Sequence, residues 1–228
     1  MYLNNMDLPC LDIETAPCNG APQEYALQPW RVREGTSKIS NIGLGKASGE
    51  AFVVTKPEQF RSLLSKLDGQ YILGYNLTFD IAFLIASGFA EEVKKIHWID
   101  AMLIWKWVSN SQRKERMPAW SLSDSVKYFF KNEPWAKDFI DMKSQEVHAG
   151  ENDAYWEERA TSDCIMTARV AIEAFSRLTE QQKQSCMITM ASLVPAAESY
   201  ERGVMVDFSL IDDITPAITD EMQAIEES

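Results

Sequence analysis

The sequence is poor in the residues that build nitrogen- and sulfur-based metal sites. Its two histidines, His97 and His148, stand alone, and its four cysteines show no C-x-x-C or zinc-ligand spacing. The chain also lacks an apolar run of membrane-spanning length and a signal-peptide pattern. These absences argue against a zinc site, a disulfide framework and a membrane partner. We therefore expect reduced thiols and a cytoplasmic location.

The acidic excess of the chain is confined to one half. Residues 1–120 hold 13 acidic and 13 basic residues, whereas residues 121–228 hold 21 and 9, which accounts for the net charge of −12. A broad nucleic-acid-binding surface is disfavoured by this total. The neutral half nevertheless contains a basic, aromatic run, WKWVSNSQRKERMPAW, and a local patch of this kind can hold a short single strand.

Hydrophobic periodicity and turn residues predict an α/β protein with a mixed sheet covered by helices. The KASG turn at 46–49 indicates a hairpin, Pro57 begins a helix, and Asp100 is placed to cap the helix that follows it. The connection 16–37 is long for a compact domain and suggests a functional loop. The expected strands are 8–13, 37–45, 50–55, 71–75 and 97–100, and the main helices are 57–67, 79–88, 101–108, the helix opened by Ser121, and 153–178.

Carboxylates recur where the predicted strands end. In the run LDIET, Asp12 and Glu14 are two residues apart and project from one strand face, where their like charges repel. A cation between them would explain this placement. Asp80 follows the strand 71–75, and Asp163 lies beside an apolar stripe of the long helix. Each acid taken singly is typical of a solvated charge, so the inference depends on their convergence.

Together these residues resemble the DEDD 3′–5′ exonucleases. The order D-x-E, then Asn76-x-x-x-Asp80, then Asp163 is similar to the proofreading domain of family A DNA polymerases. HWIDAML resembles the D-T-M-L segment of that family and SLSDSVKYFF its next helix, while AAESYERGVMVDFSLIDDI looks like the start of the polymerase thumb. The resemblance implies a ribonuclease H-like five-stranded sheet in an exonuclease domain, 1–178, and a helical segment, 179–228, that adds nothing to the chemistry.

The resemblance also implies a reaction and its partners. Phosphodiester hydrolysis would use two Mg²⁺ ions about 3.5–4 Å apart, with Mn²⁺ as a substitute. Asp12 would bridge both ions, Glu14 and Asp163 would hold the ion that activates water, and Asp80 would support the other. The substrate would be a single-stranded or frayed DNA 3′ end, contacted by Asn76, Thr15 and Arg159. The remaining partner would be the polymerase portion of the same longer chain, as in bacteriophage enzymes acting in the host cytoplasm.

One position departs from the family pattern. Family A proofreaders carry tyrosine four residues before the last acid, and here that residue is Arg159. Tyr155 is two helical turns from Asp163, His148 precedes the helix, and Arg159 could simply form an ion pair with Asp163. An inactive DNA-binding scaffold and an RNase D-like ribonuclease therefore remain as alternatives. Further residues could contact the single-stranded nucleic acid. The alternative is core packing for the tryptophans and a solvated loop for the QRKER run. These candidates are Trp30, Arg31, Arg33, Trp105, Lys106, Trp107, Arg113, Lys114 and Arg116.

Overall fold

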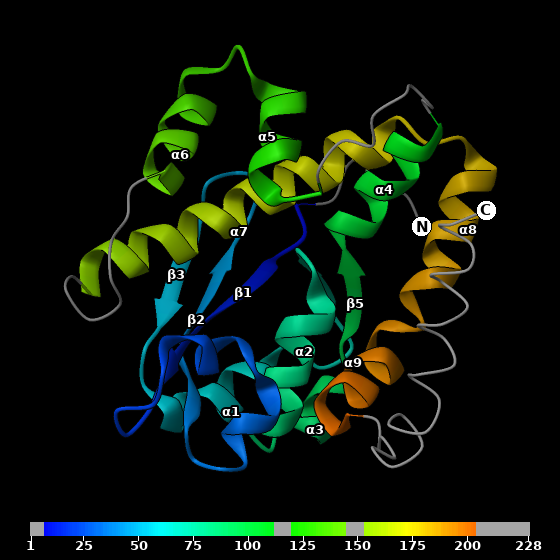
Figure 1. The fold of residues 1–228 in the computed structure, drawn as a ribbon. Helices are drawn as coiled ribbons and strands as arrows, with labels where there is room; N and C mark the ends of the chain where they lie inside the picture. Colours follow the sequence, from blue (N-terminus) through cyan, green and yellow to red (C-terminus); the bar gives the residue numbers. More distant parts are fainter. Residues whose placement is uncertain (1–6, 112–119, 145–152, 204–228) are drawn as a thin grey trace, which may run out of the picture.

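A single mixed sheet forms the centre of the molecule in the computed structural model (Figure 1), which describes residues 7–111, 120–144 and 153–203. The strand order is β3-β2-β1-β4-β5. The pairs β1–β2 and β2–β3 are antiparallel, whereas β1–β4 and β4–β5 are parallel. The expected mixed five-stranded sheet is thus confirmed. The strands are β1 (Cys10–Pro17), β2 (Ser37–Gly45), β3 (Ala51–Val54), β4 (Tyr71–Gly74) and β5 (His97–Asp100).

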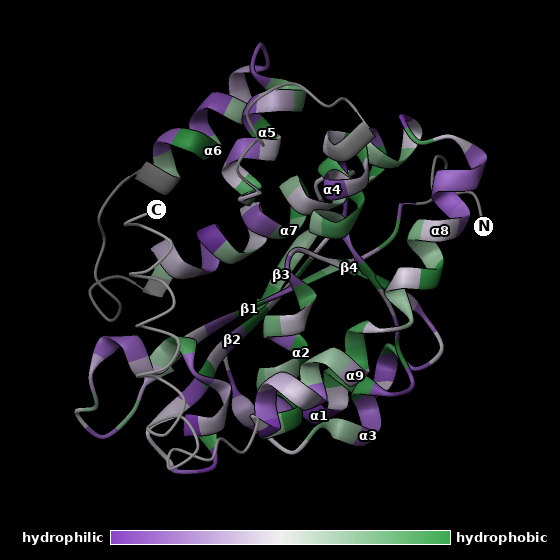
Figure 2. Ribbon diagram, turned by 45° about the vertical axis from the view of Figure 1, so that its right-hand side comes forward, coloured by the Kyte–Doolittle hydropathy of each residue, from purple (hydrophilic) through white to green (hydrophobic). Residues whose placement is uncertain are grey.

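Helices cover the sheet and extend beyond it. The long helix α7 (Asp153–Ser176) crosses β1, β2, β3 and β4, and α4 and α5 pack against it. Figure 2 shows hydrophobic residues concentrated on the strands and on α2, and more hydrophilic ones on the outer helices. The other helices are η2 (Gln23–Leu27), η3 (Pro29–Val32), α1 (Pro57–Lys66), α2 (Leu77–Ala86), α3 (Ala90–Val93), α4 (Ala101–Ser111), α5 (Leu122–Phe130), α6 (Pro134–Ser144), α8 (Glu180–Met190) and α9 (Leu193–Arg202).

Local sequence accounts for most of these boundaries. The hairpin β2–β3 and the helix beginning at Pro57 are confirmed, and the Ser121 hydroxyl accepts a hydrogen bond from the Asp124 amide at the start of α5. Strand β1 runs to Pro17 rather than ending at Ile13, because its pairing with β2 continues past the acidic residues. The long connection contains two short 3₁₀ helices, and α3 and α6 were not among the predicted helices.

The last two described helices belong to the same core as the sheet. Cys186, Met190, Leu193 and Ala197 are buried in the hydrophobic cluster that includes the strands. Helix α9 packs on α2, and the Arg33 guanidinium binds the buried Glu201 carboxylate at 2.7 Å. A functional division at residue 178 remains a prediction, and residues 204–228, with most of the thumb-like motif, lie outside the described residues. None of the described helices combines the length and apolar composition that a membrane span requires.

We predict that helix α9 stabilises the whole domain. Leu193→Ala should lower the free energy of unfolding by about 2–5 kcal/mol, because the Leu193 side chain is buried in the shared core. Ile188→Ala is the control, since Ile188 is 75% exposed on the preceding helix and should change stability by less than about 0.5 kcal/mol. Urea denaturation followed by far-UV circular dichroism measures both. Equal small effects would mean that α9 is an independent appendage.

Candidate metal centre

Three carboxylates converge between β1 and α7. Asp12 and Glu14 alternate with the buried Leu11 and Ile13 along β1, so both acids lie on the same side of the strand. Asp163 enters from α7, and one carboxylate oxygen from each of the three acids lies within 4.8 Å of the other two. The convergence expected from the sequence is present for these three residues.

The helix reaches the strand because β2 carries glycine beneath it. A Cβ atom at Gly43 would lie 3.1 Å from the Ala160 Cβ, and one at Gly45 would lie 2.8 Å from the Cys164 Cβ. The second distance is shorter than any normal carbon–carbon contact, so a larger residue there would push α7 outward. The small residues on both elements therefore set the distance between Asp163 and the acids of β1.

Asp80 lies beside this group rather than within it. Its side chain is 4% exposed, and its Oδ1 accepts a hydrogen bond of 3.1 Å from the Ile13 amide on β1. Burial raises the pKa of Asp80 to about 8, with smaller contributions from the charges of Asp100 and Glu14, against the lowering effect of the Ile13 hydrogen bond. Burial also holds the pKa of Asp12 well above its usual range, and the charges of Asp163, Asp80 and Glu14 add to the effect.

A fifth carboxylate, Asp100, orients the helix that carries Asp80. Asp100 is 1% exposed and accepts hydrogen bonds from the amides of Asn76 and Leu77, both at 3.0 Å, and from that of Met102 at 2.8 Å. The predicted cap of α4 is confirmed, and the same side chain also caps α2, which the sequence did not indicate. Asn76 adopts a left-handed conformation (φ +60°) at this junction and is exposed, as a substrate contact requires.

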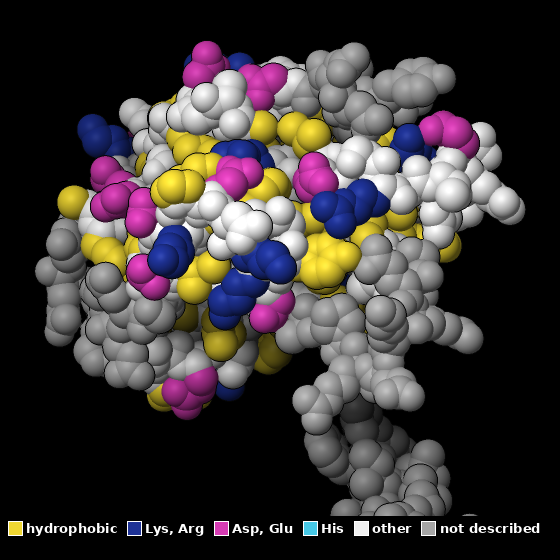
Figure 3. Space-filling view, turned by 90° about the horizontal axis from the view of Figure 1, so that it is seen from above, with side chains coloured by type: hydrophobic (Ala, Val, Ile, Leu, Met, Phe, Trp, Pro, Cys, Tyr) yellow, Lys and Arg dark blue, Asp and Glu magenta, His cyan; other side chains and the backbone are white. Residues whose placement is uncertain are grey.

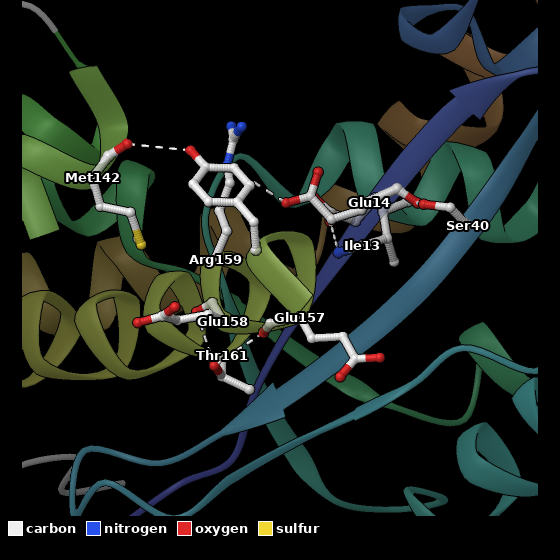
Figure 4. Close-up of polar contacts among 10 residues, drawn as sticks. Ile13, Glu14, Ser40, Met142, Glu157, Glu158, Arg159 and Thr161 are labelled. Carbon is white, nitrogen blue, oxygen red and sulfur yellow. Dashed lines mark hydrogen bonds and ion pairs between the residues drawn. The ribbon is translucent and has the colours of Figure 1, made fainter. Parts of the chain in front are cut away.

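Arg159 reaches the acids through Glu14. Its Nε lies 3.7 Å from Glu14 Oε1, which is an ion pair but too long for a hydrogen bond, and its guanidinium lies 5.0 Å from the centre of the Trp156 ring. Figure 4 shows Arg159 extending from α7 toward Glu14. The Tyr155 hydroxyl instead donates to the Met142 carbonyl at 3.2 Å. His148 lies outside the described residues.

Thr15 and the basic, aromatic residues have mixed outcomes. The Thr15 hydroxyl donates to the Ala26 carbonyl at 2.5 Å, which fixes η2 against β1. Trp105 is 1% exposed, so core packing explains it and a role in base stacking is wrong. Lys106 lies 4.7 Å from the Trp120 ring centre. Figure 3 shows that basic side chains are interspersed with hydrophobic and acidic ones on the face of the molecule seen from above. Arg113, Lys114 and Arg116 lie outside the described residues.

The donor set fits a hard divalent cation. All three converging ligand groups are carboxylates, which suit Mg²⁺ and Mn²⁺ and not the nitrogen and sulfur preferences of zinc or copper. Their mutual repulsion is the second indication, because a cation between them would remove the charge interactions that raise the pKa of Asp12. Asp12, Glu14 and Asp163 could hold such an ion, and Asp80, which lies outside this group, could support a second one.

The fold is that of known nucleases. No protein-family model matches the chain, and no curated protein matches it either. Among solved structures, Brucella melitensis NrnC bound to pGG is similar, with 17% sequence identity and a TM-score of 0.62. The match covers 88% of this chain and 87% of the NrnC chain. Brucella melitensis NrnC with bound Mg²⁺ has 16% sequence identity and a TM-score of 0.59, and the match covers 88% of each chain. A structure described as the apo form of a nuclease has 16% identity and a TM-score of 0.58, with 84% of this chain and 83% of that chain covered. These matches confirm the ribonuclease H-like architecture.

We predict that the metal-free protein loses stability as the pH rises from about 4 to 8. The folded-state pKa of Asp80 lies above its ordinary value, so the folded protein binds this proton more tightly than the unfolded chain does. The resulting stabilisation is complete at low pH and is lost as the pH passes through about 8. Thermal unfolding in EDTA should show a falling melting temperature over this range.

Two variants test the source of that pH dependence. Asp80→Asn should flatten the slope in part, since Asp12 still contributes to it. Asp68→Asn, at an exposed turn, should leave the slope as it is. Added Mg²⁺ should stabilise the wild-type protein more at pH 8 than at pH 5, because it competes with protons for the same carboxylates. An equal slope in the wild type and Asp80→Asn would show that Asp80 does not carry the shift.

Proposed function

We propose that the protein is a metal-dependent 3′–5′ exonuclease that removes nucleotides from single-stranded or frayed 3′ ends. The observation that carries this proposal is the convergence of Asp12, Glu14 and Asp163 within 4.8 Å at the junction of β1 and α7. Burial and the charges of Asp163, Asp80 and Glu14 hold the pKa of Asp12 well above its usual range, which costs stability, so the retention of these acids is best explained by a cation-dependent reaction. The nuclease fold supports the same interpretation.

Different residues of the chain would hold the metal ions, position the helix α2 and contact the substrate. Asp12, Glu14 and Asp163 would hold one ion, and Asp12 with Asp80 a second. Such ions lower the pKa of a bound water and stabilise the charge on the attacking and leaving oxygens. Asp80, fixed by the Ile13 amide, keeps α2 against the middle of β1. The exposed Asn76, whose backbone amide donates to Asp100, would hydrogen-bond the single-stranded substrate.

The structurally similar protein NrnC suggests what kind of substrate this chain binds. NrnC has been solved with Mg²⁺ and with pGG, and we infer by analogy that this chain acts on short single strands at a magnesium centre. Proofreading within a family A polymerase is our proposal for its biological setting, supported by the sequence resemblance that extends into residues 204–228. An RNase D-like ribonuclease is the second candidate, favoured by the likeness to the pGG-bound nuclease.

We predict that degradation requires both a divalent cation and the acids of β1. Purified protein should shorten a 5′-labelled single strand of DNA or RNA from its 3′ end with Mg²⁺ or Mn²⁺ and not with EDTA. Asp12→Ala combined with Glu14→Ala should abolish this activity without lowering the melting temperature, because it removes mutually repelling charges. Glu157→Gln is the matched control, an exposed acid near the site but outside the group. Degradation by the double variant at the wild-type rate would rule out this site.

A second prediction concerns Arg159. An arginine is always protonated, so it cannot accept the proton of an attacking water, and loss of a proton-transfer partner can cost about 10²–10⁴-fold in rate. We therefore expect a slow enzyme that is stimulated by Mn²⁺ and by higher pH. Arg159→Tyr should raise the single-turnover rate without tightening DNA binding.

The control for this substitution is Arg177→Tyr, directly after the end of α7, where the native arginine pairs with Glu173. That variant should leave the rate unchanged. If Arg159→Tyr instead slows the reaction, the ion pair between Arg159 and Glu14 is itself needed for catalysis. Single-turnover measurements with enzyme in excess separate this chemical effect from product release.

A further inference from the structure

A cavity of about 650 Å³ adjoins the acid cluster. It lies between the ends of β1 and β2, the 3₁₀ helix η2 and the first turns of α7. Glu14 and Arg159 line it on the side of the cluster, Ser40 and Asn41 line it from β2, and Trp156 lines it from α7. The volume is large enough for a nucleoside, and Glu14 belongs both to the lining of the cavity and to the candidate metal centre.

A β-bulge shapes the wall of this cavity. Glu14 is paired with Asn41 and Thr15 with Ile39, so Ser40 is an extra residue on β2. The Ser40 hydroxyl donates to the Glu14 carbonyl at 2.9 Å and fixes the irregularity beside the acid (Figure 4). Bulges of this kind redirect side chains next to active sites. Here two consecutive residues, Ser40 and Asn41, both line the cavity, while Ile39 stays in the core.

The bulge directs a buried polar group toward this space. Asn41 is 5% exposed, and its Oδ1 has no hydrogen-bond partner among the described residues. A buried acceptor without a partner lowers the stability of the fold, so a purely structural residue at this place would be apolar. The cost is recovered when a ligand supplies a donor. The Trp156 Nε1 is also buried and without a partner among the described residues, and it borders the same cavity.

The position of Asn41 limits what this donor can be. Directly opposed residues of an antiparallel pair have Cβ atoms about 4.5–5.5 Å apart, so Asn41 lies next to Glu14. In a nucleic-acid strand each phosphate is bonded to two sugars, and each base is attached to a sugar. When a phosphate lies at the acid cluster, the sugars are therefore nearer to the cluster than the bases are. Hydroxyl groups are the hydrogen-bond donors of a sugar. An acceptor this close to the cluster therefore meets a sugar hydroxyl before it meets a base.

We propose that Asn41 is a specificity-determining residue that accepts a hydrogen bond from a hydroxyl of the sugar bound in this cavity. The inference rests on the proposed function, because it takes the phosphate of that nucleotide to lie at the acid cluster. The base then extends along the cavity toward Trp156 and Leu27, whose side chain is 62% exposed. The donor is the 2′-hydroxyl, which distinguishes RNA from DNA, or the 3′-hydroxyl, which marks a strand end.

Binding of nucleoside monophosphates tests this inference. Adenosine 5′-monophosphate, its 2′-deoxy analogue and its 3′-deoxy analogue are titrated into the full-length protein with Mg²⁺, and binding is followed by calorimetry. The wild type should bind the analogue that lacks the recognised hydroxyl about five- to tenfold more weakly than the parent nucleotide. Asn41→Leu, of similar volume and with no acceptor, should bind all three with affinities within about twofold of each other. Thr55→Val, at an exposed position lining the same cavity, should keep the wild-type preference.

Measurements of stability and of metal binding distinguish sugar recognition by Asn41 from a structural role and from failure of the proposed function. Asn41→Leu should not lower the melting temperature, because it removes an acceptor that has no partner among the described residues. Asn41→Ser, which shortens the side chain, serves the same test if the leucine variant does not fold. Equal binding of all three nucleotides by the wild type, or an unchanged preference in the Asn41 variants, overturns the inference. Failure of the wild type to bind Mn²⁺ would overturn the proposed function instead.

Discussion

The close approach of α7 to β2 is the constraint on which the site depends. Because Gly43 and Gly45 have no side chains, the helix can lie directly on β2. A Cβ atom added at Gly45 would be only 2.8 Å from the Cys164 Cβ. That contact places Asp163 opposite the two acids of β1, although Asp163 is 149 positions from Glu14 in the chain. A methyl group at Gly45 would move the helix, and the carboxylate with it. The geometry of the acids is therefore set by packing, before any cation is bound.

The cost of this arrangement is electrostatic, and the surrounding structure offsets it. Burial and like charges raise the pKa values of Asp12 and Asp80, so in the metal-free protein these groups favour the protonated form at the expense of folding stability. Asp80 is held by the Ile13 amide, and Asp100 fixes the first turns of both α2 and α4 through three backbone hydrogen bonds. Arg159, on the same helix as Asp163, places a positive charge beside Glu14. Fixed carboxylates that resist reorganisation are what a cation-dependent reaction needs.

Local and non-local information contributed differently to the prediction of this structure. The strands, the hairpin, most helices and the caps at Ser121 and Asp100 were predictable because short-range periodicity and hydrogen bonding determine them. The convergence of the acids on β1 and α7 followed from a sequence resemblance. The bulge at Ser40, the second cap made by Asp100 and the ion pair between Arg159 and Glu14 depend on strand register and on side-chain conformation across distant segments. A linear pattern contains no such information, and the cavity beside Glu14 could not have been anticipated for the same reason.

Crystallography with Mn²⁺ tests the central claim most directly, because anomalous scattering locates the metal independently of any activity. Crystals of the wild-type protein soaked in Mn²⁺ should show an anomalous peak bounded by the carboxylates of Asp12, Glu14 and Asp163, with oxygen–metal distances near those of hard divalent cations at about 2.0–2.3 Å. A second peak between Asp12 and Asp80 is expected when a nucleotide phosphate is also bound. The absence of a peak among these acids at saturating Mn²⁺, or an ion bound only elsewhere, would contradict the account.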